Sequence, residues 1–167
     1  MSVADRLRWL LVTGCGLGLA PFASGTFGTL GGVALALVLQ ATLAGQTLAC
    51  ALAGLAGALL IVGCTMGGFS ARVLKTADPK PFVLDEIVGY LVAVAVLAFW
   101  RGEPSPTGHA AAFLVFRAFD VWKPWPASRL EDLPGAPGIM LDDVAAGAYS
   151  GLVLGALPWL GLGVALG

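Results

Sequence analysis

Charged residues are scarce in this chain and unevenly placed. Only 11% of its 167 residues are charged, whereas soluble domains carry about 25%. No charged residue occurs between Arg8 and Arg72, and none occurs in residues 144–167. One helical membrane crossing needs about 20 predominantly apolar residues. The sequence therefore predicts an all-α, polytopic membrane helical bundle that forms a single domain over residues 1–167.

Several functional classes are excluded by residues that the chain lacks. The net charge of −1 provides no basic field for nucleic acid. The three cysteines lie in apolar sequence without CxxC spacing, which favours helix packing over metal binding or disulfides. No cysteine is followed six residues later by arginine, and no Asp-x-Asp-x-Thr/Val pattern occurs. These absences argue against a cysteine-phosphatase loop and against the hydrolases that carry the Asp-x-Asp-x-Thr/Val pattern, while direct attack by water and a covalent intermediate on another aspartate both stay open.

Apolar segments predict about four to five membrane spans and a short N-terminal helix. Residues 7–19 are too few to cross a bilayer, so an interfacial or re-entrant helix is expected there. The predicted spans are residues 27–44, 48–69, 85–100, 109–122 and 142–163.

The positive-inside rule gives the orientation of these spans. With a cytoplasmic N-terminus, Arg101 is the one basic residue in a predicted loop on the opposite side of the membrane. His109, the only histidine, also falls there, so histidine-based catalysis is not expected. The cytoplasmic side receives Arg6, Arg8, Arg72, Lys75, Lys80, Lys123 and Arg129.

Acidic residues gather at the predicted cytoplasmic ends of three helices. Asp120 lies near the end of an inward helix, while two adjacent pairs begin outward helices. Helix capping explains one member of each pair, but not Asp120, because an anion at a helix C-terminus opposes the dipole. The candidate site acids on this side are Asp78, Asp85, Glu86, Asp120, Asp142 and Asp143.

A bound divalent cation would explain why these acids gather at one end, because its charge offsets the repulsion between the carboxylates. Mg²⁺ prefers hard oxygen ligands, commonly carboxylates, water and a substrate phosphate. Arg117, Lys123 and Lys80 would supply positive charge for that phosphate, although Arg117 and Asp120 are also spaced for a simple salt bridge. Gly25 and Thr26 precede a helix at the same level and could offer N–H groups to phosphate. A cation- or proton-coupled transporter is the alternative, because acids within membrane helices often mark ion paths.

Four blocks of sequence carry the charged and glycine-rich motifs. They are LAPFASGTFGT from Leu19, VLDEIVG from Val83, FRAFDVWKPWP from Phe116 and GIMLDDVAAG from Gly138. Together these blocks resemble the phosphatidylglycerophosphatase A family of integral membrane lipid phosphatases. The first block departs from the family at Ser24, where proline is usual.

The resemblance implies Mg²⁺-dependent removal of the terminal phosphate of phosphatidylglycerophosphate, a step of phospholipid biosynthesis in the bacterial cytoplasmic (inner) membrane. Its expected product is phosphatidylglycerol, and the site would lie on the cytoplasmic face. Sequence does not separate metal ligands from the catalytic base, so the two candidate sets overlap. The catalytic candidates are Asp85, Glu86, Asp120 and Asp143; the metal candidates are Asp78, Asp85, Glu86, Asp142 and Asp143; and the phosphate-binding candidates are Arg117, Lys123, Gly25, Thr26 and Lys80.

Overall fold

The structure, a computed structural model, describes residues 2–69 and 81–157. Throughout this part of the chain the regular secondary structure is helical, as the sequence predicted. The elements are α1 (Val3–Val12), the 3₁₀-helix η1 (Leu17–Leu19), α2 (Ser24–Gln40), α3 (Gly45–Thr65), α5 (Leu84–Arg101), α6 (Pro106–Trp122), α7 (Ala127–Glu131) and α8 (Ala136–Ala156).

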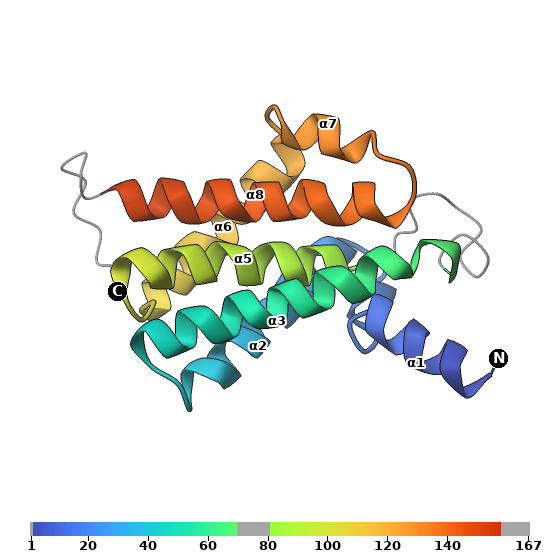
Figure 1. The fold of residues 1–167 in the computed structure, drawn as a ribbon, viewed down its shortest axis with the longest axis horizontal. Helices are drawn as coiled ribbons and strands as arrows, with labels where there is room; N and C mark the ends of the chain where they lie inside the picture. Colours follow the sequence, from blue (N-terminus) through green and yellow to red (C-terminus); the bar gives the residue numbers. More distant parts are fainter. Residues whose placement is uncertain (1, 70–80, 158–167) are drawn as a thin grey trace.

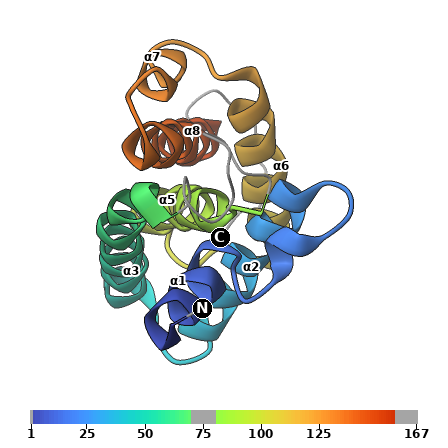
Figure 2. The ribbon, with the colours of Figure 1, turned by 90° about the vertical axis from the view of Figure 1, so that its right-hand side faces the viewer.

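Helix α5 forms the centre of the bundle. Seen end-on, it is surrounded by α2, α3, α6 and α8, while α1 lies at the rim (Figure 2). Most of its side chains are buried, including Tyr90, Leu91 and Val94, which are 0% exposed. In the side view α2, α5 and α8 all begin toward the same end of the bundle, where α7 also lies (Figure 1). The N-termini of three helices and the C-terminus of α6 therefore share one end.

Glycines allow α5 and α8 to pack closely. A Cβ atom at Gly147 would overlap the carbonyl oxygen of Gly89, and one at Gly89 would lie 2.7 Å from the carbonyl oxygen of Asp143. Small residues of this kind let helix backbones approach one another. Asp85 and Asp143 each precede one of these glycines by four residues, about one helical turn. The same contact therefore brings the two carboxylates to one level.

The N-terminal segment contains two helical pieces instead of one helix over residues 7–19. Helix α1 begins at Val3 because Ser2 and Asp5 form a capping box, with each side chain accepting a hydrogen bond from the other residue's backbone N–H. It ends at Val12, before three residues with positive φ, Gly14, Cys15 and Gly16. Left-handed backbone cannot continue an α-helix, so η1 starts afresh at Leu17.

The predicted start of the last helix at Asp142 was wrong. Helix α8 begins at Ala136, after Gly135 with φ of 77°, and has proline in its first turn, where a missing N–H group costs nothing. Asp142 and Asp143 therefore lie inside the helix, about two turns from its start. Capping cannot explain them. The predicted loop 123–141 also contains α7 and the first turn of α8.

Two helices of the described residues, α3 and α8, are long and apolar enough to cross a membrane, and α2 is a shorter apolar helix. Large apolar side chains are also exposed elsewhere on the bundle, among them Ile61, Phe99 and Leu114, which are 70%, 60% and 67% exposed. Soluble monomers seldom expose extensive apolar surface.

The α5–α8 contact yields a prediction about stability. We expect Gly147→Ala to destabilise the folded protein by about 1–3 kcal/mol, the usual cost of overpacking, because its methyl group would meet Gly89. The thermal unfolding midpoint in detergent measures this. Gly54→Ala is the matched control, since a Cβ there meets nothing within 4 Å. Equal midpoints for the two variants would contradict the close contact.

Candidate active site

Six carboxylates line one cavity at the end of the bundle where α5 and α8 begin. The cavity has a volume of about 300 Å³ and is formed by α5, the end of α6, α7 and the first turns of α8. We call it the acidic cavity; it is lined by Asp85, Glu86, Asp120, Lys123, Glu131, Leu133, Gly135, Ile139, Asp142 and Asp143.

Three of these carboxylates form a compact cluster. One carboxylate oxygen from each of Asp85, Glu86 and Asp143 lies within 4.8 Å of the other two. Asp85 is 9% exposed and Asp143 is 3% exposed. Oε2 of Glu86 is buried and accepts no hydrogen bond from the described part of the chain. We refer to these residues as the carboxylate cluster.

The carboxylate cluster fits a hard divalent cation. Like charges at this spacing and burial repel one another unless a cation or protons intervene. Oxygen donors from two or three carboxylates, with water completing the shell, suit Mg²⁺ or a similar ion. Asp85, Glu86 and Asp143 are thus the residues able to hold a metal.

Lys123 connects α6, α7 and α8. It is the C-cap residue of α6 in left-handed backbone, and its Nζ donates to Glu131 Oε1 at 2.6 Å and to Asp142 Oδ2 at 2.7 Å. Burial lowers the pKa of Lys123, but the hydrogen bonds to Asp142 and Glu131 outweigh it and raise that pKa above its ordinary value. Lys123 therefore remains a cation at the cavity wall.

Arg117 contacts both Asp120 and Glu86, a member of the carboxylate cluster. Its Nη1 is 2.5 Å from Asp120 Oδ2 and 4.0 Å from Glu86 Oε1. Both distances are within the range of an ion pair. Among the described residues, however, Nη1 has no partner with hydrogen-bond geometry. The expected salt bridge with Asp120 is thus present, and it holds the guanidinium beside the cluster.

The N-terminus of α2 also meets this group. A Cβ at Gly25 would overlap Glu86 Oε1 and would lie 2.9 Å from Arg117 Nη1 and 3.0 Å from Nη2. Ala23 precedes the helix in left-handed backbone, and no described side chain caps this end. Gly25 is therefore needed for close approach, and the positive end of the α2 dipole adjoins Arg117. Thr26 lies one residue further along the same turn.

The structure thus brings together residues from four separate stretches of sequence. Asp85, Glu86, Asp120, Lys123, Asp142 and Asp143 share the acidic cavity, and Gly25 and Arg117 adjoin it. Asp142 pairs with Lys123 and stands outside the carboxylate cluster. His109 is bonded to Tyr90 and Gln40, away from the cavity. Asp78 and Lys80 lie outside the described residues.

Glu131 is a cavity residue that the sequence did not single out. It ends α7 and is bonded to Lys123 eight residues earlier. No helical spacing links the two, because a proline-containing turn separates α6 from α7. The sequence signal that could have indicated Glu131 is its acidic side chain in the segment between Lys123 and Asp142, two residues already predicted to belong to the site.

Comparison with known proteins agrees with this arrangement. The family model described as phosphatidylglycerophosphatase A matches residues 10–158. The chain belongs to the phosphatidylglycerophosphatase A family. It is accordingly a phosphoric monoester hydrolase, and the resemblance found in its sequence motifs is confirmed.

Curated relatives of this phosphatidylglycerophosphatase A family member come from several bacteria. Phosphatidylglycerophosphatase A of Escherichia coli is 30% identical over 152 residues, covering 87% of this chain and 80% of the relative. The Haemophilus influenzae protein of the same name is 32% identical over 153 residues, covering 90% and 88%. A Bacteroides thetaiotaomicron protein, provisionally described as a phosphatidylinositol-3-phosphatase, is 34% identical over 163 residues, covering 96% and 99%. No solved structure matches the chain.

The contact of Gly25 with Glu86 and Arg117 can be tested by adding a methyl group. We expect Gly25→Ala to lower kcat by about tenfold to a hundredfold, because displacements of about 1 Å in a catalytic site have effects of this size. Phosphate release by purified protein is the measurement. Gly57→Ala, where a Cβ meets nothing within 4 Å, is the control. Wild-type activity in Gly25→Ala would show that α2 does not adjoin the site.

Proposed function

We propose that this enzyme hydrolyses the terminal phosphate of phosphatidylglycerophosphate in a Mg²⁺-dependent reaction that gives phosphatidylglycerol and phosphate. The observation that carries the proposal is the carboxylate cluster with Arg117 and Lys123 beside it, in a chain of the phosphatidylglycerophosphatase A family. The family supports the lipid substrate. The geometry supports a metal-assisted phosphate site.

Asp85, Glu86 and Asp143 would hold the metal. A bound divalent cation polarises phosphoryl oxygens and lowers the pKa of water. Asp120 and Asp142 have a different task, since each is paired with a cation of the site. Glu131 also pairs with Lys123, so the six acids of the cavity would divide into three that bind metal and three that position Arg117 and Lys123.

Arg117, Lys123 and the N-terminus of α2 would receive the phosphate. The Arg117 guanidinium offers several N–H donors in a planar fork that matches phosphate oxygens. Gly25 and Thr26 present the uncapped first turn of α2 to the same region. Stabilisation of charge on the transferring phosphoryl group is usually the main contribution to this class of catalysis.

The reaction itself is a displacement at phosphorus. The oxygen of a water molecule bonds to phosphorus, and the bond from phosphorus to the glycerol oxygen breaks. A carboxylate of the cavity accepts the proton of the attacking water, and the departing glycerol oxygen gains a proton to become a hydroxyl group. The products are an alcohol and inorganic phosphate.

The same proposal places the enzyme in the bacterial cytoplasmic membrane, with about four to five spans and the site on the cytoplasmic face. Helices α2, α3, α5, α6 and α8 would supply the spans. Arg101 ends α5 at the opposite end of the bundle, as the positive-inside rule favours. Helices α1, which carries Arg6 and Arg8, and α7, which carries Arg129, lie toward the acidic cavity's end (Figure 1). Lys123 lines the cavity itself.

Exposed aromatic side chains support this placement. Trp122 and Trp125, beside the cavity, are 74% and 77% exposed, and Trp100 near the other end is 50% exposed. Tryptophan is enriched at both interfaces of a bilayer. The transporter alternative gains no support, because it requires acids through the membrane interior and these acids gather at one end.

Phosphate release in detergent micelles tests the proposal. We expect release to require Mg²⁺ and to stop with a chelator. Asp143→Asn should lower kcat by about a hundredfold or more, as expected for lost electrostatic stabilisation. Asp132→Asn, an exposed acid outside the cavity, should retain wild-type activity.

Phosphatidylinositol 3-phosphate is the necessary comparison substrate, given the description of the Bacteroides relative. Faster release from it than from phosphatidylglycerophosphate would overturn the substrate assignment and keep the site. Full activity with chelator, or in Asp143→Asn, would overturn the metal assignment.

A further inference from the structure

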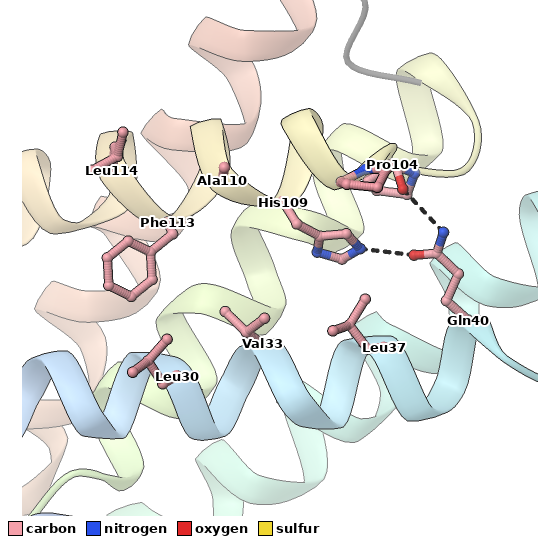
Figure 3. Close-up of a pocket in the computed structure, with 10 residues that line it drawn as sticks. Leu30, Val33, Leu37, Gln40, Pro104, His109, Ala110, Phe113 and Leu114 are labelled. Carbon is pink, nitrogen blue, oxygen red and sulfur yellow. Dashed lines mark hydrogen bonds between the residues drawn. The ribbon is translucent and has the colours of Figure 1, made fainter.

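An apolar groove of about 610 Å³ lies between α2 and α6. Leu30, Val33 and Leu37 project from α2 toward α6, and Phe113 projects from α6 toward α2 (Figure 3). Ala110 and Leu114, both on α6, also line the groove. Leu30, Leu37 and Leu114 are 47%, 49% and 67% exposed, so the groove is open to its surroundings. We call it the α2–α6 groove.

One end of the groove is closed by polar side chains. Gln40 Nε2 donates to the carbonyl oxygen of Pro104 at 3.0 Å, and Gln40 Oε1 is 2.7 Å from His109 Nε2 (Figure 3). His109 Nδ1 is in turn 2.8 Å from the buried Tyr90 hydroxyl. These groups satisfy one another, so they offer no site for a charged ligand. They mark where the apolar part of the groove stops.

The other end of the groove leads to the active site along both helices. Leu30 lies five residues after Gly25 on α2, about 7.5 Å along the axis. Arg117 lies four residues after Phe113 on α6, about one turn away. A Cβ at Gly25 would overlap Glu86 Oε1, and Arg117 Nη1 lies 4.0 Å from the same oxygen. The apolar groove and the phosphate end of the site therefore share both walls.

The length of the groove also suggests its occupant. Leu30 to Gln40 spans ten residues of helix, or about 15 Å. The hydrocarbon core of a bilayer is about 30 Å thick, so the chains of one leaflet extend over about 15 Å. A lipid acyl chain with its phosphate at Arg117 would thus fill the apolar length and end near Gln40.

We propose that the α2–α6 groove binds one acyl chain of the phospholipid substrate, and this rests on the function proposed above. The chain would run from the glycerol backbone near Leu30 toward Gln40. Binding energy from this remote part of the substrate would hold the phosphate against Arg117 and the carboxylate cluster. A second apolar groove, lined by Leu35 and Val38 among others, shares no lining residue with the α2–α6 groove and provides the control.

Chain-length selectivity tests the groove. We would measure kcat/KM for long-chain (dioleoyl) and short-chain (dioctanoyl) phosphatidylglycerophosphate at equal mole fraction in mixed micelles. Leu37→Trp fills the distal groove, so the ratio of long-chain to short-chain kcat/KM should fall by about tenfold, the effect of losing roughly two buried methylene contacts. Val38→Trp, the adjacent position in the other groove, should keep the wild-type ratio. An unchanged ratio in Leu37→Trp overturns the proposal.

A second measurement uses the wild-type protein and does not depend on the folding of a variant. A substrate analogue with a diazirine near the end of one acyl chain is photolysed, and the adducts are mapped by mass spectrometry. We expect adducts on Leu37, Ala110 and Phe113 that unlabelled substrate displaces. Displaceable adducts on α3 instead, or dimers cross-linked through the groove, would overturn the proposal. If the wild-type protein releases no phosphate from either substrate, that result contradicts the proposed function itself, and the acyl-chain proposal falls with it.

Discussion

The contact between α5 and α8 at Gly89 and Gly147 is the constraint on which the acidic cavity depends. Each glycine lies one turn after an aspartate, so the two backbones cannot approach at this point without bringing Asp85 and Asp143 together. Apolar packing of α5 against its neighbours stabilises this contact, while the carboxylates it assembles repel one another. A divalent cation at the cluster would turn that repulsion into a further link between the two helices.

The two cations of the site are held by acids that do not belong to the carboxylate cluster. Asp120 holds Arg117, one turn away on α6, while Asp142 and Glu131 hold Lys123. This division explains why two adjacent aspartates occur in α8: successive residues of a helix point about 100° apart, so Asp143 faces the cluster and Asp142 faces Lys123. In α5 both members of the adjacent pair, Asp85 and Glu86, contribute to the cluster.

The sequence predicted the helical class, the boundaries of α5 to within about one residue and the gathering of acids at one end of the bundle. These predictions succeeded because apolar length and charge placement are directly visible in sequence. The start of α8 was misplaced because Asp142 looked like the first polar residue of an apolar helix, whereas Gly135 and Pro137 set the true beginning. The separate partners of Asp142 and Asp143, and the contribution of Glu131, depend on how α7 folds back onto α8. Spacing in the chain carries no information on that contact.

Binding of a divalent cation by the carboxylate cluster can be measured without any substrate. Mn²⁺ shares the preference of Mg²⁺ for carboxylate oxygens and is observable by electron paramagnetic resonance. We expect saturable Mn²⁺ binding by the wild-type protein in detergent, competition by Mg²⁺, and an affinity for Mn²⁺ weakened by at least about tenfold in Asp85→Asn. Equal Mn²⁺ binding by wild-type protein and Asp85→Asn, or no saturable binding at all, would contradict metal binding at the carboxylate cluster.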